Sequence, residues 1–268
     1  MVILYNPYGN HSNRLFQNLH FEAFCHQNNI QYYNAVFSDM APLYKNPVKA
    51  KYCFLSKILR NKYIRLLQKK HLIKNIVSFD ADTGNNSDIL LNNKNRLCFV
   101  GGWLFRAYNA TKELRELFRE KYALKDEYFV TNELYNRIIK IKKEDSLVVG
   151  VHIRRGDYAT FANGAYFYTD AVYKKIIDRV KELLLDRFHK KIYFVVFSND
   201  SVEFDDRSII ISKNNWYVDQ YLMTFCDYLI GPPSTFTMWA SYIGKVPYFH
   251  IDSPECTVIL DKFRVCDG

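Results

Sequence analysis

The sequence lacks any apolar run long enough to cross a bilayer, which takes about 20 residues, and it has no cysteines in Cys-x-x-Cys spacing. Its first residues show no basic cluster followed by a long apolar core, so we expect no secretory signal peptide. The six cysteines are scattered, as buried free thiols are. These absences predict a cytoplasmic protein without a membrane span and without a disulfide framework.

What the chain contains instead is apolar and aromatic residues, at 49% and 16% of 268 residues, which exclude a disordered protein. The net charge is +9, and the segment from Lys45 to Lys74 holds ten Lys or Arg residues and no acidic one. Apolar residues recur through this segment and predict a basic amphipathic helix or helix pair. Two interpretations of this segment are equally supported. It makes peripheral contact with the inner face of an anionic membrane, or it forms a solvated basic face over the core. We expect no nucleic-acid partner, because no nucleic-acid-binding motif occurs here.

Strand and helix patterns alternate along the C-terminal half, which predicts an α/β fold with a parallel, doubly wound sheet. The expected strands are 147–151, 192–197, 209–211, 228–230 and 246–250, and the expected helices are 169–188, a helix through 221–223, and 235–242. The N-terminal half is less regular, with expected strands at 2–5, 32–37 and 96–100 and helices after Asn13, near 111–122 and at 131–141. The charged stretch 140–145 predicts a boundary between two small lobes, 1–143 and 144–268.

The most informative segment is His152 to Tyr158, which reads His-Ile-Arg-Arg-Gly-Asp-Tyr and follows the apolar strand 147–151. This position is the carboxyl end of a buried parallel strand, where open α/β sheets bind ligands. Two adjacent guanidiniums, Arg154 and Arg155, match phosphate oxygens in charge and geometry and predict a phosphorylated ligand. The alternative is an ion pair with Asp157 that ties a loop to the sheet.

A second candidate site is the turn Gly231-Pro232-Pro233-Ser234-Thr235, where a strand leads into a helix. Free backbone N–H groups and the positive end of the helix dipole bind anions there, and two hydroxyls add donors. A plain helix cap explains one such hydroxyl without any ligand. Combined with the loop from Arg154 to Tyr158, which we call the arginine loop, the turn predicts a phosphate site.

Four blocks of the sequence resemble glycosyltransferase family 11, the α-1,2-fucosyltransferases. The segment 152–158 resembles the family's H-x-R-R-x-D motif, and Asn13 to Gln17 resembles its N-terminal G-N-Q-L-F-Q segment. Phe197 to Asp200 is similar to its F-S-x-D strand end. The block from Asp219 to Trp239 is similar to its D-x-x-x-M-x-x-C and S-T-F-S-W-W segments. The four occur in the family's order.

The resemblance implies a GT-B architecture: two small Rossmann-type lobes with parallel sheets and a cleft between them, lobe 1–143 on the acceptor side and lobe 144–268 holding the nucleotide sugar. It implies inverting, metal-independent transfer of fucose from GDP-fucose to a glycan hydroxyl, with an α-1,2 linkage on a surface polysaccharide and no cofactor. The residues that it implies as catalytic are Arg154, which binds the β-phosphate, Arg155 and Asp157. Those implied to bind substrate are His152, Asp200, Asp219 (which pairs with guanine), Ser234, Thr235, Phe236, Asn13 and Arg14.

Two features keep other interpretations open. Asp80-Ala81-Asp82 spells the D-x-D motif of metal-dependent glycosyltransferases that use other nucleotide sugars, but the triplet is too short to be specific, and we favour a turn after 76–79 as its explanation. The basic segment leaves a non-catalytic membrane-binding or nucleic-acid-binding protein as a further alternative. An acceptor base is not identified by the sequence; His11, Glu22 and Asp80 are candidates.

Overall fold

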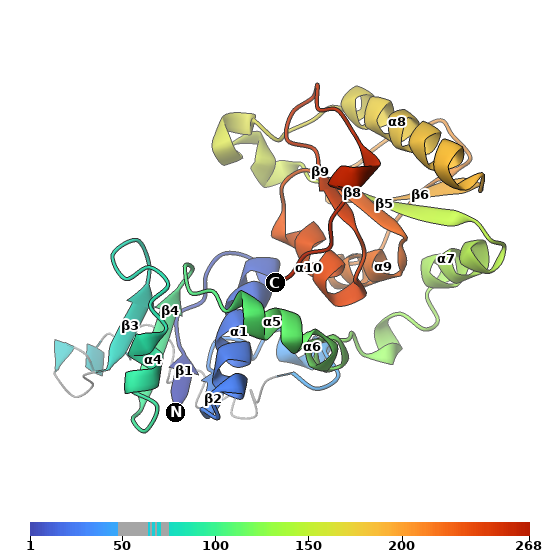
Figure 1. Cartoon of the computed structure of the whole chain (residues 1–268). Coiled ribbons are helices and arrows are strands. Elements are labelled where there is room, and N and C mark those ends of the chain that lie inside the picture. Colours follow the sequence, from blue (N-terminus) through green and yellow to red (C-terminus); the bar gives the residue numbers. More distant parts are fainter. Residues whose placement is uncertain (48–63, 65, 68, 71–74) are drawn as a thin grey trace. The chain divides into compact units, whose positions relative to one another are not determined.

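The computed structural model describes residues 1–47, 64, 66–67, 69–70 and 75–268. The chain forms two compact units: unit 1 comprises Met1–Ala123 with Asp267–Gly268, and unit 2 comprises Leu124–Cys266 (Figure 1). The basic amphipathic helix that the sequence predicts in 45–74 lies largely outside the described residues.

Unit 1 is built on a four-stranded parallel sheet in the order β2-β1-β4-β3. Its strands are β1 (Val2–Leu4), β2 (Tyr32–Asn34), β3 (Ile76–Phe79) and β4 (Cys98–Gly102). The helices of this unit whose bounds lie in the described residues include α1 (His11–Gln27), η1 (Ala41–Leu43), α4 (Asp88–Asn92), α5 (Tyr108–Glu113) and α6 (Arg115–Lys121). One core cluster joins α1 to the sheet through Phe21 and Cys25, which pack with Val2, Leu4 and Val100. Burial of these apolar side chains is the main force that holds the unit together.

Unit 2 contains a five-stranded sheet in the order β7-β6-β5-β8-β9, and every neighbouring pair is parallel. Its strands are β5 (Leu147–Ile153), β6 (Ile192–Ser198), β7 (Ile209–Ile211), β8 (Tyr228–Gly231) and β9 (Tyr248–His250). Its helices are η2 (Asp126–Tyr128), α7 (Glu133–Lys143), η3 (Gly156–Ala159), η4 (Phe161–Gly164), α8 (Asp170–Phe188), α9 (Trp216–Leu222), η5 (Met223–Phe225), α10 (Thr235–Gly244) and η6 (Leu260–Lys262).

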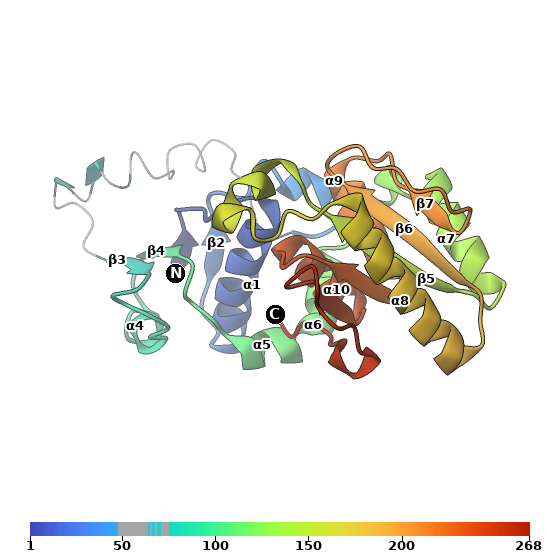
Figure 2. The same ribbon diagram turned by 90° about the horizontal axis from the view of Figure 1, so that it is seen from above.

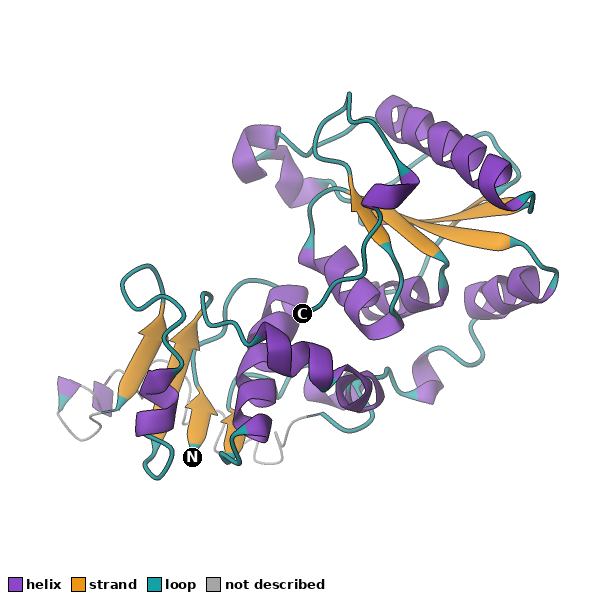
Figure 3. Cartoon of the chain, in the orientation of Figure 1, coloured by secondary structure: helices purple, strands orange, loops and turns teal. Residues whose placement is uncertain are grey.

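Helices cover both faces of the unit 2 sheet, which is why its central strands are apolar throughout. Helix α8 lies on one face, and α7, α9 and α10 lie on the other (Figures 1 and 2). The colouring by secondary structure shows the strands between these two helix layers (Figure 3). On the α8 side, Val149 and Val151 of β5 pack against Ile176 and Val180 of α8 in a buried cluster. His152 therefore points to the opposite face, because side chains alternate along a strand.

The strand order of unit 2 places a topological switch between β5 and β8. From β5 the chain moves outward through β6 to β7, and it then returns to β8 on the other side of β5. In open parallel sheets, the crevice at the carboxyl ends of the two strands beside such a switch is where ligands bind. The segments that leave these two strands are the arginine loop after β5 and the turn Pro232–Ser234 after β8.

The compact units divide at Ala123, about twenty residues before the boundary that the sequence predicts at 143/144. The reason is that α7 packs in unit 2: Lys142 forms an ion pair with Asp227 at 2.8 Å and donates to the Phe225 carbonyl at 3.0 Å. At the other end of the chain, Asp267 belongs to unit 1, where the Arg115 guanidinium binds its carboxylate at 2.9 Å.

The alternating α/β pattern is confirmed, with shorter strands at β2 and β9 and with the expected helix 111–122 divided into α5 and α6. Five cysteines, namely Cys25, Cys98, Cys226, Cys256 and Cys266, are free thiols, as expected. In the part of the chain that the structure describes, no helix has the length and apolar character of a membrane span.

Candidate active site

Arg154 follows the last residue of β5 and is held by its own loop. Its Nε and Nη2 donate to the two oxygens of Asp157 at 3.1 and 2.7 Å. Its guanidinium also lies 4.8 Å from the centre of the Tyr158 ring. Gly156 between them has a φ of +59°, a left-handed conformation that favours glycine and lets the loop turn back on itself. Arg154 is thus oriented by two neighbours while remaining partly exposed.

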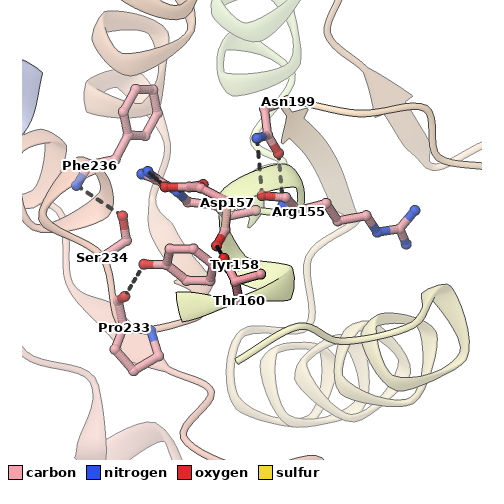
Figure 4. Close-up of polar contacts among 9 residues, drawn as sticks. Arg155, Asp157, Tyr158, Thr160, Asn199, Pro233, Ser234 and Phe236 are labelled. Carbon is pink, nitrogen blue, oxygen red and sulfur yellow. Dashed lines mark hydrogen bonds and ion pairs between the residues drawn. The ribbon is translucent and has the colours of Figure 1, made fainter. Parts of the chain in front are cut away.

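The Arg155 side chain points away from the turn at Ser234 (Figure 4). Its guanidinium forms an ion pair with Asp170 at the start of α8 and donates to the Ser201 carbonyl at 3.1 Å. Its backbone is clamped by Asn199 after β6, which accepts from the Arg155 N–H at 2.8 Å and donates to its carbonyl at 3.3 Å. The interactions of Arg155 therefore join the arginine loop to α8 and to the end of β6.

The turn after β8 meets the arginine loop directly. The Tyr158 hydroxyl donates to the Pro233 carbonyl at 2.6 Å (Figure 4). Ser234 caps α10, since its Oγ accepts from the Phe236 N–H at 3.2 Å, and the Ser234 N–H faces His250 Nε2 at 3.5 Å. The N-terminus of α10, with its positive dipole end, thus lies at the same sheet edge as Arg154. The sequence prediction that these two elements adjoin each other is confirmed.

His152 is buried between β5 and α10. Its Nδ1 lies 3.0 Å from Thr237 Oγ1, and its ring stacks on Phe236 with 4.9 Å between centroids. Burial, reinforced by the Arg154 charge, lowers the pKa of His152 to about 3, so the imidazole is neutral near pH 7. Strand β8 lies close to His152 because Gly231 has no side chain. A Cβ at Gly231 would lie 2.8 Å from the His152 carbonyl oxygen.

Asp219 is a buried carboxyl group in α9, near the carboxyl end of β7. The Ser212 hydroxyl donates to its Oδ1 at 2.5 Å. Burial raises its pKa to about 7, an effect that hydrogen bonds from Ser212 and Asn214 only partly offset. The carboxyl is therefore engaged by the loop after β7, and the group changes charge close to neutral pH.

Asp200, like Asp157, is exposed at this edge. It forms a tight turn after β6, in which its N–H donates to Ser198 Oγ at 3.2 Å and its Oδ1 accepts from the Ser201 N–H at 2.8 Å. Unit 2 therefore brings Arg154, Arg155, Asp157, Asp200, Asp219 and Ser234 to the carboxyl ends of neighbouring parallel strands or the segments that follow them.

A comparison with protein families identifies the family of this chain. The sequence model described as glycosyl transferase family 11 matches residues 103–247, more than half of the chain. The chain belongs to glycosyltransferase family 11. No curated protein sequence matches it.

Solved structures agree with the family at the level of the fold. A fucosyltransferase NodZ from Bradyrhizobium superposes with a TM-score of 0.56 at 14% identity, covering 95% of this chain and 96% of that one. A mutant of Arabidopsis thaliana FUT1 in complex with GDP superposes with a TM-score of 0.54 at 12% identity, covering 98% of this chain and 73% of that one. The two parallel sheets with their helices are thus a GT-B-like fold of the kind found in fucosyltransferases.

The family's N-terminal block, Asn13 to Gln17, lies in α1 of unit 1. Arg14 binds the two oxygens of Asp39 at 2.8 and 2.6 Å and also donates to the Val36 carbonyl. Asn13 lies one turn beyond Gly9, where a Cβ would clash with the Asn13 amide at 2.3 Å. The contacts of Arg14 tie α1 to the segment after β2, a structural function beside the substrate-binding one that the resemblance implies.

Asp80 and Glu22, two of the candidates for the acceptor base, have local structural functions. Asp80 closes the turn after β3: its Oδ1 accepts from the Asp82 N–H at 3.2 Å and its carbonyl from the Gly84 N–H at 2.7 Å. The triplet thus lies in the turn that the sequence predicts after 76–79. Among the described residues, no group of three or more His, Cys, Asp or Glu side chains could hold a metal ion. Glu22 is buried and accepts from the Tyr122 hydroxyl and from Lys121.

Sequence reasoning missed three residues of the site. Tyr158 supports Arg154 and reaches the α10 turn, Asn199 clamps the Arg155 backbone, and Asp170 pairs with the Arg155 side chain. Tyr158 and Asn199 belong to blocks that resemble the family, so their positions carried a signal. Asp170 carried none, because its pairing depends on how α8 packs on the sheet.

Proposed function

We propose that this family 11 glycosyltransferase transfers fucose from GDP-fucose to a hydroxyl of a glycan with inversion at the fucosyl carbon. The observation that supports it best is the contact between the Arg154 loop and the N-terminus of α10 at the switch point of a parallel sheet. Such an edge binds phosphates. The donor assignment is supported by the family and by the fucosyltransferase fold.

In this proposal each residue at the edge has a defined function in donor binding, by direct contact or by positioning another residue. Arg154 binds the β-phosphate, and Ser234 and Thr235 present the N-terminus of α10 to the same diphosphate. Asp157 orients Arg154, and Arg155 holds the loop in place through Asp170. Phe236 and neutral His152 form an aromatic wall for the guanine, Asp219 accepts from guanine N1 and N2, and Asp200 faces the nucleotide.

The reaction breaks the bond between the fucosyl C1 and the diphosphate oxygen. The bonding electrons leave with GDP, and the acceptor oxygen forms the new bond to C1 from the opposite side. Arg154 and the α10 dipole stabilise the negative charge that develops on the leaving diphosphate, which is the largest electrostatic contribution available here. The acceptor proton passes to a base or to solvent. Because Arg154 and the α10 dipole stabilise the negative charge of the leaving group, we propose that the transfer needs no metal.

The finer points of the proposal concern the acceptor. We propose that unit 1 binds the glycan, that Asn13 and Arg14 of α1 lie on the substrate side of this unit, and that the product is an α-1,2 linkage on a surface polysaccharide. A cytoplasmic location, with peripheral membrane contact through residues 45–74, completes this proposal; vesicles containing anionic lipids would test it by sedimentation.

The nucleotide decides the sugar class, so the first experiment is a thermal-shift titration with GDP, UDP, CMP and ADP. A ligand at 100 times its Kd stabilises a protein by about 2.7 kcal/mol, and we expect GDP to do so at far lower concentrations than the others. Stabilisation by UDP or ADP in preference to GDP would contradict the donor assignment.

The second experiment follows transfer from GDP-fucose to a panel of oligosaccharides. We expect Arg154→Ala to lower kcat/KM by about 100-fold or more, because one preorganised oxyanion ligand is worth that much. Arg179→Ala is the matched control, since Arg179 forms an exposed ion pair with Glu182 on α8 at 3.3 Å. Full transfer by the Arg154 variant would remove its catalytic assignment. Loss of transfer with EDTA and recovery with Mn²⁺ would contradict metal independence.

A further inference from the structure

An exposed aromatic side chain is held rigidly at the carboxyl end of the unit 1 sheet. Tyr8, which follows β1, stacks on Trp103, which follows β4, with 4.8 Å between ring centroids and 16° between ring planes. Tyr8 is 44% exposed. By contrast, the stacked pair of Phe21 and Phe105 in the same unit is fully buried in the core. The Tyr8 stack therefore does not serve to fill the core.

Gln17 of α1 fixes the two loops that carry this stack. Its Oε1 accepts from the Tyr8 N–H at 3.1 Å, and its Nε2 donates to the carbonyls of Asn6 at 3.1 Å and Gly102 at 2.7 Å. Gln17 is itself buried. Gly102 adopts a φ of +89°, and a Cβ there would lie 2.2 Å from the Phe79 carbonyl oxygen, so glycine is required where the chain leaves β4. The backbone at both aromatic residues is thus fixed before any ligand binds.

Arg106 extends the same cluster. Its guanidinium carbon lies 4.2 Å from the centre of the Trp103 ring, and its Nη1 donates to the Phe105 carbonyl at 2.8 Å and to the Trp103 carbonyl. The Arg106 side chain also forms a hydrogen bond with the exposed side chain of Tyr108. Its backbone N–H donates to Asn85 Oδ1 at 2.7 Å, which brings the polar turn after β3 against the cluster. The indole of Trp103 therefore contacts both the Tyr8 ring and the Arg106 guanidinium.

The shape and chemistry of this cluster fit a sugar ring. One face of a pyranose presents C–H groups, which pack on the electron-rich face of an aromatic ring, while its hydroxyls need polar partners at the rim. Tyr8 offers a partly exposed ring, and Asn85 belongs to the adjacent polar turn. A ring that is fixed before binding loses little conformational entropy when a ligand covers it, which favours a binding function.

We propose that Tyr8, supported by Trp103, is a stacking platform for a pyranose ring of the acceptor glycan. The proposal rests on the proposed function, because that function requires a glycan acceptor, and it assigns the acceptor contact to specific residues of unit 1. The position agrees with the rule that parallel sheets bind ligands at the carboxyl ends of their strands.

The test compares Tyr8→Leu with Tyr8→Phe. Leucine keeps an apolar side chain but removes the planar ring, whereas phenylalanine keeps the ring and removes only the hydroxyl. The labelled native chain is first applied to an array of defined oligosaccharides that includes lactose and N-acetyllactosamine, and the strongest ligand becomes the probe for titration and transfer kinetics. For Tyr8→Leu we expect the Kd and the acceptor KM of that probe to rise about 5- to 10-fold, with kcat changed little. Tyr8→Phe should stay within about 2-fold of the native chain.

The matched control is Phe188→Leu, which changes another exposed aromatic residue, at the last position of α8 in unit 2. It should leave the Kd of the probe unchanged. No binding of any oligosaccharide, or equal Kd values for Tyr8→Leu and the native chain, would overturn the platform while leaving GDP binding in place. Weaker GDP binding by Tyr8→Leu would also overturn it, because the ring would then stack on the nucleotide base. If GDP failed to bind the native chain but the Tyr8-dependent sugar affinity persisted, the donor assignment would fail and the platform would stand.

Discussion

Arg154 and Asp157 form a two-point ion pair within a single loop, with N–O distances of 3.1 and 2.7 Å. The Arg154 side chain is 23% exposed and that of Asp157 is 53% exposed. The pair holds the guanidinium in one orientation and lowers the pKa of Asp157 mainly through the hydrogen bond from Arg154. An incoming phosphate must share this guanidinium with Asp157 or displace it, so the exposed carboxylate competes with the proposed ligand.

The first prediction follows from this competition. Asp157→Asn removes the competing charge, and because an exposed ion pair contributes about 0.2–1 kcal/mol, we expect GDP to bind up to about 5-fold more tightly. Arg154→Lys should bind GDP more weakly than the native chain, since a point charge does not reproduce the two-point contact. Isothermal titration calorimetry with GDP at constant ionic strength measures both effects. Weaker binding by Asp157→Asn would instead show that the orientation of Arg154 by Asp157 matters more for GDP binding than the competition between their charges.

The second prediction separates the two adjacent arginines. The Arg155 side chain is mostly buried and bonds Asp170 and the Ser201 carbonyl, so its loss leaves these partners without their charged donor. Hydrogen bonds to charged groups contribute about 1.5–3 kcal/mol, and for a protein of this size each kcal/mol corresponds to about 2–4 °C in Tm. We expect Arg155→Ala to lower Tm by roughly 4–10 °C and Arg154→Ala to lower it by less than about 2 °C.

Differential scanning fluorimetry without nucleotide checks this ordering. Asp170→Asn serves as the partner variant and should lower Tm in the same direction as Arg155→Ala. If Arg155→Ala kept the native Tm but lost GDP binding as strongly as Arg154→Ala, both guanidiniums would act on the ligand, and the structural function of Arg155 would be wrong.

These two arginines also show how far sequence reasoning reaches. The run of apolar residues before His152 places both arginines at a strand end, and this placement is correct because it depends only on the pattern along the chain. The direction of each side chain depends on partners from other elements. Arg155 turns toward Asp170 because α8 packs on that face of the sheet, a tertiary contact that no local pattern encodes.

The boundary between units differs from the prediction for the same reason. The charged stretch 140–145 resembles a linker in composition, yet Lys142 pairs with Asp227, which lies 85 positions further along the chain, and thereby joins α7 to unit 2. The stack of Tyr8 on Trp103 likewise joins two loops that are distant in the sequence. What the sequence predicts well is therefore the order of elements and the edge where the site forms.

The third prediction concerns acid stability. Burial lowers the pKa of His152 and His20 to about 3 and that of His250 to about 4, all from 6.5. The unfolded chain therefore binds more protons than the folded chain at mildly acidic pH. The stability that these groups contribute is fully present above pH 6.5 and is lost as the pH falls toward 3–4. We expect Tm to fall steadily below pH 6.5, and NMR titration should show these three imidazoles neutral between pH 5 and 8; a His152 resonance that titrates near pH 6.5 would contradict its burial.

The fourth prediction uses Asp219, whose pKa shifts in the opposite sense. Burial raises it from 3.8 to about 7, so the folded chain retains a proton that the unfolded chain releases. The stability contributed by this group is present below pH 3.8 and is lost as the pH rises through 7. Asp219→Asn keeps an oxygen that can accept from Ser212 but cannot ionise. We therefore expect the Tm of Asp219→Asn relative to the native chain to increase between pH 5 and 8, by about 2–4 °C for each kcal/mol of burial cost that is removed.

The same carboxyl group links stability to nucleotide recognition. If Asp219 accepts from guanine N1 and N2, it must be ionised to do so, and GDP affinity of the native chain should rise between pH 6 and 8. Asp219→Asn should bind GDP at least about 10-fold more weakly at pH 8 and lose this pH dependence, because the amide replaces one acceptor by a donor. Inosine diphosphate, which lacks the guanine 2-amino group, is the matched ligand control and should discriminate less between the two proteins. The variant and the native chain could bind GDP equally at pH 8 and still differ in Tm in a pH-dependent way. That result would show that Asp219 only fixes the loop at Ser212.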